Sequence, residues 1–368
     1  HDQSQAEWLA SYYTGRKRDE IRRVDFQTDF NHEYPAVNRL LPVYRVAFGA
    51  EEAMVAFIHT ETGALASLLN PFKNRLQWIF QNLHTFKWLD GLENLRLLLA
   101  GTLLVTLAVM AIIGLVLLFA YKPRVIKDGK RRYHRRLAYL AWLPLLAWSA
   151  SGFYHLLQSS LVERQFGLRL GLPYESLRSE PLNNDSLQTL AGRVVNNLSL
   201  IRADDQNLYW RVSVARDQSE QAVSRQDRFA GNAAEQSAIY LPLVAGGSAK
   251  PLRDEALARA MVLRFTGASG EQVLATRLVT RFGSEYDFRN KRLPVWAVEL
   301  NDADKTIVFV DTATGILVDS TRSIDRLEGL SFSILHKWNH LHGVLGPKVR
   351  DLLMVCTIFL LLIVTLFG

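Results

Sequence analysis

The residues of this sequence best suited to chemistry are its nine histidines. His134 precedes an uncharged apolar stretch and His155 lies near the end of that stretch, 21 positions later, which corresponds to roughly 31 Å along an α-helix. The two side chains cannot bind the same metal centre, but each could bind one of two centres at opposite ends of a helix. Neutral imidazole is the usual protein ligand of b-type haem iron. Ionisable residues at membrane depth also tend to mark function.

Both histidines have simpler interpretations as well. His134 lies in the basic segment Arg131–Arg136 and could belong to a cationic surface beside lipid head groups. His155 follows two aromatic residues and could belong to an aromatic belt at the other interface. Repetition favours ligation, because His1 falls where the outer end of a helix preceding this sequence would lie.

A second pair of histidines, His84 and His336, occupies equivalent positions in an internal repeat. Each stands about twelve residues before the start of a predicted membrane helix. Their aromatic neighbours are Trp78, Phe80, Phe86 and Trp88 for the first, and Phe332 and Trp338 for the second. A flat porphyrin requires such apolar walls. The alternative is an amphipathic helix on the membrane surface, with its histidine turned to the head groups.

The motif HxxxHxH formed by His336, His340 and His342 could hold zinc or copper, because its first two members share a helical face. No cysteine or carboxylate completes the motif. In the repeat, moreover, His340 aligns with a tryptophan and His342 with an aspartate. Copper handling is therefore the weaker alternative.

Three apolar stretches set the architecture: Leu97–Ala120, Leu137–Val162 and Leu352–Gly368 carry no formal charge. A bilayer core requires about 20 apolar residues in a helix. The first two stretches reach this length and the third falls slightly short. We therefore predict three membrane helices, and we expect a fourth before residue 1 because the N-terminal domain is predicted to lie outside.

The net charge of +7 is concentrated between two of these stretches, where Lys122–Arg136 holds eight basic residues and one aspartate. Such a loop is typical of the cytoplasmic side of a membrane. Because it accounts for the high pI, the pI is not evidence of nucleic-acid binding. The predicted organisation is an outer domain over residues 1–95, a membrane helix over 96–121, a basic cytoplasmic loop over 122–136, a membrane helix over 137–160, a second outer domain over 161–346 and a membrane helix over 347–368.

The repeat is recognisable at an offset of 252 residues. Leu41–Tyr44 aligns with Leu293–Trp296, and Phe57–Gly63 aligns with Phe309–Gly315. The same register includes His84 with His336. One gapless register over more than fifty residues indicates a duplication.

Each copy is predicted to be a small α+β unit. Strands are expected over Val43–Phe48, Met54–His59, Pro294–Glu299 and Ile307–Asp311, with turns at Thr60–Gly63 and Thr312–Gly315. A helix is expected over Asp254–Phe265, ending near Gly267. A helix over Ser186–Leu198 followed by a strand over Leu208–Val214 would form a third, divergent copy. The fold class is thus an α+β membrane protein with helix-plus-antiparallel-sheet domains outside.

Other catalytic motifs are missing from the sequence. Its single cysteine, Cys356, excludes a disulfide framework, a CxxC metal site and a CxxCH haem attachment. There is no GxGxxG, Walker A or HExxH motif, and Gly246–Lys250 has the wrong spacing for a phosphate loop. Arginines of the second outer domain could attract anionic chelates, but exposed arginines are more often paired with carboxylates.

The chain resembles the PepSY-associated transmembrane family of bacterial inner-membrane proteins. The matching residues are the strand-turn-strand units ending at Glu61–Gly63 and Ala313–Gly315, Leu83-His84 and Leu335-His336 before membrane helices, Tyr133–Arg136 opening another, and Ser151–His155 at its outer end. The resemblance covers nearly the whole chain. PepSY units themselves are not specific to redox work.

Within that family, the sequence is similar to the iron-regulated branch of di-haem ferric-siderophore reductases. The resemblance implies an inner-membrane protein with periplasmic domains, two haem b groups, a ferric siderophore as substrate, and quinol or a cytoplasmic reductase as electron donor. His84, His155 and His336 would surround the outer haem. His134 would serve the inner haem, with its partner on the helix before residue 1. The alternative is a non-redox PepSY protein that binds or regulates a partner.

Overall fold

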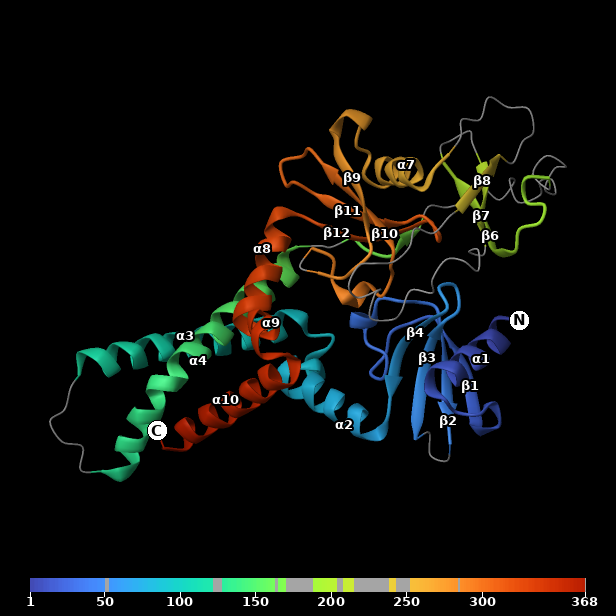
Figure 1. Ribbon diagram of the computed structural model, residues 1–368. Helices are drawn as coiled ribbons and strands as arrows, with labels where there is room; N and C mark the ends of the chain where they lie inside the picture. Colours follow the sequence, from blue (N-terminus) through green and yellow to red (C-terminus); the bar gives the residue numbers. More distant parts are fainter. Residues whose placement is uncertain are drawn as a thin grey trace. The chain divides into compact units, whose positions relative to one another are not determined.

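The computed structural model describes residues 1–49, 53–121, 128–162, 165–169, 188–203, 208–214, 238–242, 252–283 and 285–367 (Figure 1). The chain divides into two compact units, which are described separately. The first unit contains His1–Trp78 and Arg164–Ser323, and the second contains Ile79–Glu163 and Ile324–Gly368. The second unit therefore includes residues 79–95 and 324–346, which the sequence analysis placed in the outer domains.

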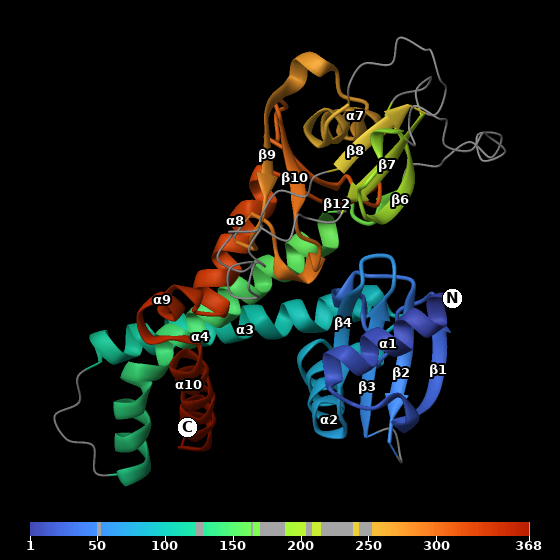
Figure 2. The ribbon, with the colours of Figure 1, turned by 45° about the vertical axis from the view of Figure 1, so that its right-hand side comes forward.

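The first unit begins with a four-stranded antiparallel sheet in the order β1-β2-β3-β4, with α1 across one face (Figure 2). The elements are α1 (Asp2–Thr14), β1 (Ile21–Gln27), β2 (Val43–Phe48), β3 (Met54–His59), β4 (Ala64–Leu69) and α2 (Pro71–Ile79). Side chains alternate between the faces of a strand. On β2, Val46 and Phe48 pack in the core with α1, whereas Val43 and Ala47 face a second core around Tyr34.

A second α+β arrangement follows in the same unit, with a five-stranded antiparallel sheet in the order β5-β12-β11-β10-β9 and α7 packed on it (Figure 1). The elements are β5 (Leu168–Arg169), α7 (Asp254–Thr266), β9 (Val273–Val279), β10 (Val295–Leu300), β11 (Ile307–Asp311) and β12 (Ile316–Thr321). The next helix, α8 (Ser323–Ser331), belongs to the second unit from Ile324 onward. The predicted strands and the predicted helix are confirmed to within one or two residues. The α+β fold class is confirmed as well.

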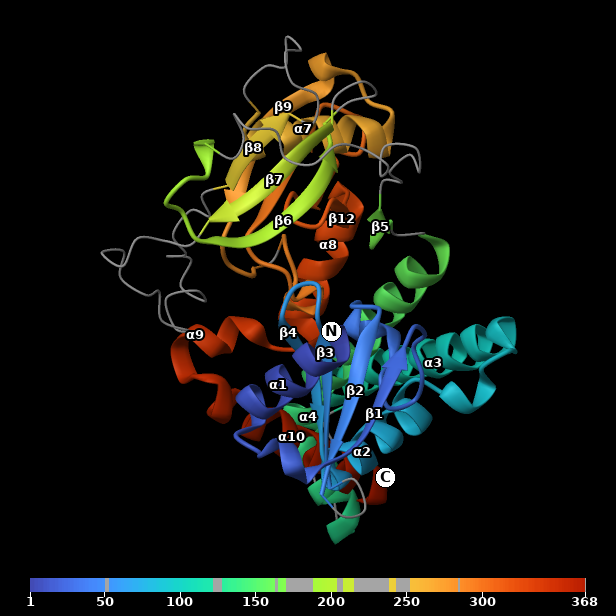
Figure 3. The same cartoon turned by 90° about the vertical axis from the view of Figure 1, so that its right-hand side faces the viewer.

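The segment predicted as a third copy has a different structure. It forms a three-stranded sheet, β6 (Val195–Arg202), β7 (Leu208–Val214) and β8 (Ala238–Pro242), visible in Figure 3. The predicted strand is β7. The predicted helix over Ser186–Leu198 is helical at residues 188–189 but wrong at its C-terminal end, where Val195, Asn197 and Leu198 pair with β7 instead. Ser186 and Gly246–Lys250 lie outside the described residues. Ile201 and Tyr209 pack against α7 and share its core.

The duplication extends further than the sequence register indicated. Gly15 ends α1 with φ 69° and ψ 8°, and Gly267, at the same offset of 252, ends α7 with φ 71° and ψ 8°. The cis bonds Leu41-Pro42 and Leu293-Pro294 also correspond, as do the strand irregularities between Phe57/Ile58 and Phe309/Val310. The two copies therefore share backbone detail from α1 through α2 and from α7 through α8.

The two copies are joined by equivalent residues. Arg39 and Lys291 correspond in the repeat, and both have left-handed backbone conformations, with φ 59° and 56°. Arg39 Nη1 donates to Asp319 Oδ2 at 2.7 Å and to Asn290. Lys291 Nζ donates to Asn38 Oδ1 at 2.6 Å and to the carbonyl of Ala66. Each copy thus inserts one cation into the other.

His59, the last residue of a strand predicted from the sequence, is fully buried at the end of β3. Its Nδ1 lies 2.7 Å from Thr62 Oγ1, and its Nε2 lies 3.8 Å from Glu61 Oε2, too far for a hydrogen bond. Burial, with a smaller contribution from Arg292, lowers the pKa of His59 to about 4. The imidazole is therefore neutral in the folded protein at pH 7.

Acidification is expected to destabilise the first unit through His59. Between pH 7 and 5 the unfolded chain takes up a proton at this side chain and the folded chain does not, so the free energy of unfolding falls by roughly 2 kcal/mol. Unfolding of the detergent-solubilised protein at both pH values, compared with His59→Leu, measures the effect. The variant should lose less stability on acidification than the wild type by about this amount. Equal losses would contradict the assignment.

The second unit is helical. Its long helices are α3 (Glu93–Ala120), α4 (Gly129–Leu161) and α10 (Pro347–Phe367), and α4 packs along both of the others (Figure 1). The short α9 (His342–Leu345) precedes α10. α4 begins at Gly129, where Asp128 Oδ1 accepts a hydrogen bond from the backbone of Lys130. Residues 129–136, assigned to the basic loop from sequence, are therefore the first two turns of this helix.

Two helices of the described chain, α3 and α10, are long and apolar enough to cross a membrane by length and composition. Only 11% of the most apolar window of α3 is buried, and none of that of α10, so neither helix resembles the core helix of a water-soluble domain. α4 has the necessary length, but polar residues interrupt its apolar stretch and it does not meet the same criterion. Two spans are thus supported where three were predicted.

Candidate functional site

Three predicted site histidines lie together in the second unit, in a continuous column of five rings. Phe80 stacks on His84 with ring centroids 4.8 Å apart, and His84 meets His336 edge-on at 6.1 Å. Phe332 stacks on His336 at 4.5 Å and on His155 at 4.4 Å. The fold thus brings together His84, His155 and His336, which are far apart in sequence.

The two repeat-related histidines end equivalent backbone irregularities. The π-helical turns Phe80–His84 and Phe332–His336 follow α2 and α8 directly. Phe86 and Trp338 then adopt left-handed conformations, with φ 51° and 52°. π-Helical turns occur frequently at functional sites, and bulky residues rarely have positive φ. The same unusual backbone around both histidines indicates a selected geometry.

α4 holds the second of these turns in place. Trp148 Nε1 donates to the backbone carbonyl of His336 at 3.0 Å, and its indole stacks on Trp338 at 5.4 Å. Gly152 lies next to the same histidine: a Cβ here would be 3.8 Å from His336 Cε1 and only 3.3 Å from the side chain of Leu104. The missing side chain at Gly152 therefore matters for the approach of Leu104 on α3, whereas His336 lies at an ordinary van der Waals distance from this position.

The hydrogen bonds of His336 favour one tautomer. Ser151 Oγ lies 2.6 Å from the carbonyl of Ala147, to which it donates its single proton, and 3.3 Å from His336 Nδ1. The hydroxyl can therefore only accept from the imidazole, which places the proton of His336 on Nδ1 and leaves Nε2 free. Burial, together with the neighbouring histidines, lowers the pKa of His336 to about 4. The neutral ring is the form that binds metals.

His155 and His134 are held in the same way through Nδ1. His155 Nδ1 lies 2.5 Å from Glu328 Oε1. At the other end of α4, His134 Nδ1 lies 3.0 Å from the backbone carbonyl of Val364 in α10. A carboxylate and a carbonyl both accept, so each Nδ1 carries the proton and each Nε2 remains available. Fixing Nδ1 in this way is the usual device for orienting metal-binding histidines.

The remaining predicted histidines lie elsewhere. His1 is in the first unit, where it immediately precedes α1, and its repeat equivalent is Arg253. His340 and His342 are exposed. Among the residues that the structure describes, no three His, Cys, Asp or Glu side chains converge to hold a bare metal ion. The HxxxHxH motif therefore does not assemble into such a site.

The geometry of His84 and His336 is compatible with a single iron between them. Metal–imidazole bonds are about 2 Å long, so two imidazoles on opposite sides of one metal hold their ring centroids about 6 Å apart. The observed separation is 6.1 Å. With apolar rings on either side and Nδ1 of His336 already engaged, these residues fit a bis-histidine haem.

Sequence reasoning missed Glu328 and Asp325, both buried on α8. Asp325 Oδ1 accepts from Gln158 Nε2 at 2.9 Å, next to the Glu328–His155 contact. The repeat register contains a usable signal, because the equivalents of these two acids in the first copy are Lys73 and Leu76. Acidic residues that appear in only one of two related copies are candidates for a function outside the common fold.

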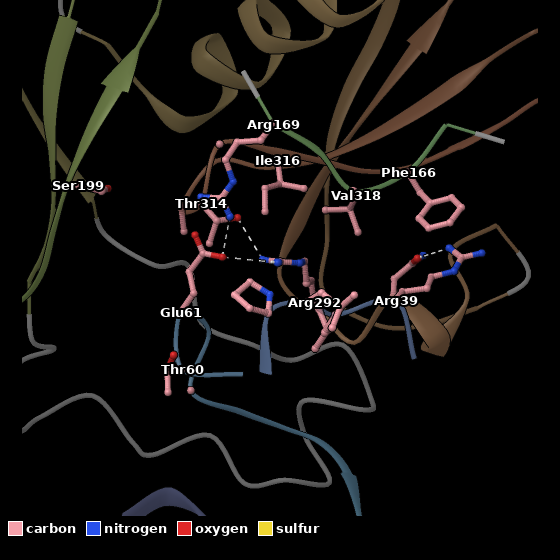
Figure 4. Close-up of a pocket in the computed structure, with 18 of the residues that line it drawn as sticks. Arg39, Thr60, Glu61, Phe166, Arg169, Ser199, Arg292, Thr314, Ile316 and Val318 are labelled. Carbon is pink, nitrogen blue, oxygen red and sulfur yellow. Dashed lines mark hydrogen bonds and ion pairs between the residues drawn. The ribbon is translucent and has the colours of Figure 1, made fainter. Parts of the chain in front are cut away.

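The first unit contains a cavity of about 1150 Å³ between the two copies (Figure 4). Figure 4 shows Glu61 lying between Arg169 and Arg292, with Arg39 against the ring of Phe166. Glu61 Oε2 lies 2.8 Å from Arg169 Nη2 and 3.8 Å from Arg292 Nη2. The turns that end in the repeated Thr-Gly pairs both line this cavity.

The arginines here and nearby are paired, as the sequence analysis favoured. Arg292 Nη1 lies 3.0 Å from Asp311, and Arg39 Nη1 lies 2.7 Å from Asp319. Arg277 contacts two glutamates, and Arg289 contacts Asp287. Carboxylates thus balance much of the positive charge of the cavity, so its electrostatic attraction for anions is weak.

No protein-family model, curated protein or solved structure matches this chain. Its function therefore has to be inferred from its own residues.

Proposed function

We propose that this chain is a membrane-bound haem b protein that reduces ferric iron held by a siderophore outside the inner membrane. The observation that supports this proposal best is the ring column around His84 and His336. Duplicated imidazoles at a separation suited to one iron, on matching π-helical turns, are difficult to explain in a protein whose helices only anchor it. Bound haem supplies reversible one-electron transfer, and ferric iron requires one electron for reduction.

The residues of the second unit have distinct tasks in this proposal. His84 and His336 bind the outer haem, and Phe80 and Phe332 cover its ligands with apolar surface. Ser151 and Trp148 fix the orientation of His336 through its side chain and its backbone. His336 is partly buried among these rings, which favours its neutral form and leaves the imidazole available to a metal.

His134 is the proposed ligand of an inner haem near the cytoplasmic end of α4. It is the only histidine between residues 85 and 154, so a second imidazole must come from a segment outside these residues. His134 lies roughly 30 Å along α4 from His155, so a group held by His134 would be distinct from one held at His84 and His336. Electrons enter at the inner side from quinol or a cytoplasmic reductase.

No acid–base group is required at the substrate in this mechanism. A siderophore binds Fe(III) as a hard cation, and reduction to Fe(II) weakens its hold, which releases iron for uptake. The siderophore itself is neither cleaved nor oxidised. What the protein must supply is a haem edge that the chelate can approach.

An absorption spectrum of the detergent-purified protein, oxidised and then reduced with dithionite, tests the proposal. A pyridine haemochrome assay gives the haem content, and reduction of a ferric siderophore is followed with a ferrous-specific dye. We expect b-type haem at up to two per chain, and oxidation of the reduced protein by the ferric chelate. Absence of haem after expression with haem supplied would contradict the proposal. A non-redox role in partner binding would then be the better explanation.

A further inference from the structure

We infer that Glu328 is a positioning residue for the ligand His336, acting through His155 and Phe332. This inference rests on the proposed haem site. Glu328 Oε1 accepts from His155 Nδ1, the His155 ring stacks on Phe332, and Phe332 stacks on His336. Glu328 thus binds the first ring of a three-ring stack formed by His155, Phe332 and His336. Through this stack it sets the plane of the His336 ring.

This three-ring stack is rigid because its rings are nearly parallel and closely spaced. The interplanar angle is 25° between His155 and Phe332 and 13° between Phe332 and His336, with centroids about 4.5 Å apart at both contacts. Rings in such offset stacks attract one another beyond simple burial. Rotation of His155 would therefore change the support of Phe332 and, through it, the orientation of His336.

Glu328 is suited to hold His155 because it is itself fixed. Only 5% of its side chain is exposed, whereas 41% of the His155 side chain is exposed. A partly exposed imidazole can rotate, and a buried carboxylate at 2.5 Å from Nδ1 restrains it. Burial of a carboxylate is costly unless its hydrogen bonds are made, so this glutamate would be an unfavourable choice for packing alone.

Comparison of the two copies separates this role from the common fold. The first copy has the same Phe80–His84 stack on the same π-helical turn. The position equivalent to Glu328 is Leu76, which cannot accept a hydrogen bond. A leucine at this position is therefore compatible with the fold of the repeat. The carboxylate in the second copy serves α4, which occurs once and has no repeat equivalent.

A neighbouring contact provides a matched control. Asp325 precedes Glu328 by three residues on α8, and its partner Gln158 follows His155 by three residues on α4. Residues at this spacing share a helical face. Asp325 is as buried as Glu328, at 4% exposure for each residue, but its partner Gln158 is not one of the rings of the column.

The test compares Glu328→Leu, Glu328→Gln and Asp325→Asn in the purified haem-loaded protein. The readouts are the affinity for haem, measured by transfer to apomyoglobin, and the low-spin ferric EPR signal, which is sensitive to the orientation of axial imidazoles. Loss of an outer-shell partner typically weakens metal binding 10–100-fold. We expect about a 10-fold loss of affinity and a shifted, broadened EPR signal for Glu328→Leu.

Glu328→Gln keeps the shape of the side chain and an oxygen acceptor, so the fold is retained even if Glu328→Leu does not fold. We expect this variant to shift the EPR signal in the same direction and to lose less haem affinity. Asp325→Asn should leave the EPR signal unchanged. Wild-type spectra and affinity in Glu328→Gln and Glu328→Leu would overturn the inference and leave the haem proposal intact. A wild-type protein without haem would overturn both.

Discussion

Replacement of His336 by alanine is expected to remove the outer haem, lowering the haem content by one per chain. His336 lies at the centre of the ring column, in contact with both His84 and Phe332. If His336 and His84 hold the haem as proposed, the substitution leaves only one imidazole to bind it. His84→Ala should have the same effect, because the two histidines are equivalent in the repeat. The haem content and the reduced α-band of each variant measure the outcome.

His340→Ala is the matched control for this prediction. His340 lies one helical turn from His336 in sequence but is exposed, and it aligns with Trp88 in the first copy. Its removal should leave the spectrum unchanged. Retention of the full haem content in both His84→Ala and His336→Ala would show that other residues bind the iron. Loss of haem in His340→Ala would instead implicate the HxxxHxH motif.

The repeated strands could be predicted from sequence because their determinants are local. Val43–Phe48 and Met54–His59 are short β-rich runs separated by turn residues, and the structure places β2 and β3 over the same residues. The helix over Asp254–Phe265 was recognisable from its period and from the glycine at its end. Its counterpart α1 was not predicted, since the repeat was traced from Leu41 onward and α1 lies before that segment.

The histidines of the candidate site could be selected from the sequence, but the residues that contact and orient them could not. His84 and His336 are distinguished by the repeat itself, so the sequence register selects them. The register shows only that Glu328 has no acidic counterpart in the first copy. Its contact could not be predicted, because the partner His155 lies 173 residues earlier on a helix outside the duplication. The π-helical turns were not predicted either, and the second of them is contacted by Trp148, which lies 188 residues before His336 in the sequence. Long-range contacts of this kind leave no local pattern.

The junction between the two copies also consists of long-range contacts that leave no local sequence pattern. Its disruption is the second of the two largest effects that we expect. Arg39→Leu is expected to lower the free energy of unfolding of the first unit by about 3–5 kcal/mol. Arg39 pairs with Asp319, whose side chain is only 5% exposed. Removal of the guanidinium leaves this carboxylate buried without its cation. Unfolding of the detergent-solubilised protein by heat or denaturant, followed by circular dichroism, measures the loss.

A double variant distinguishes the lost ion pair from damage to the packing. Arg39→Leu combined with Asp319→Leu removes both charges, and replacing a buried pair by apolar residues is often close to neutral. The double variant should therefore recover most of the stability that the single variant loses. Equal losses in the single and double variants would mean that Arg39 acts through its contacts with Asn290 and Phe166 instead. Recovery would establish that a buried ion pair holds the two copies together. The duplication alone did not supply this pair, because Asp319 corresponds to Ser67 in the first copy.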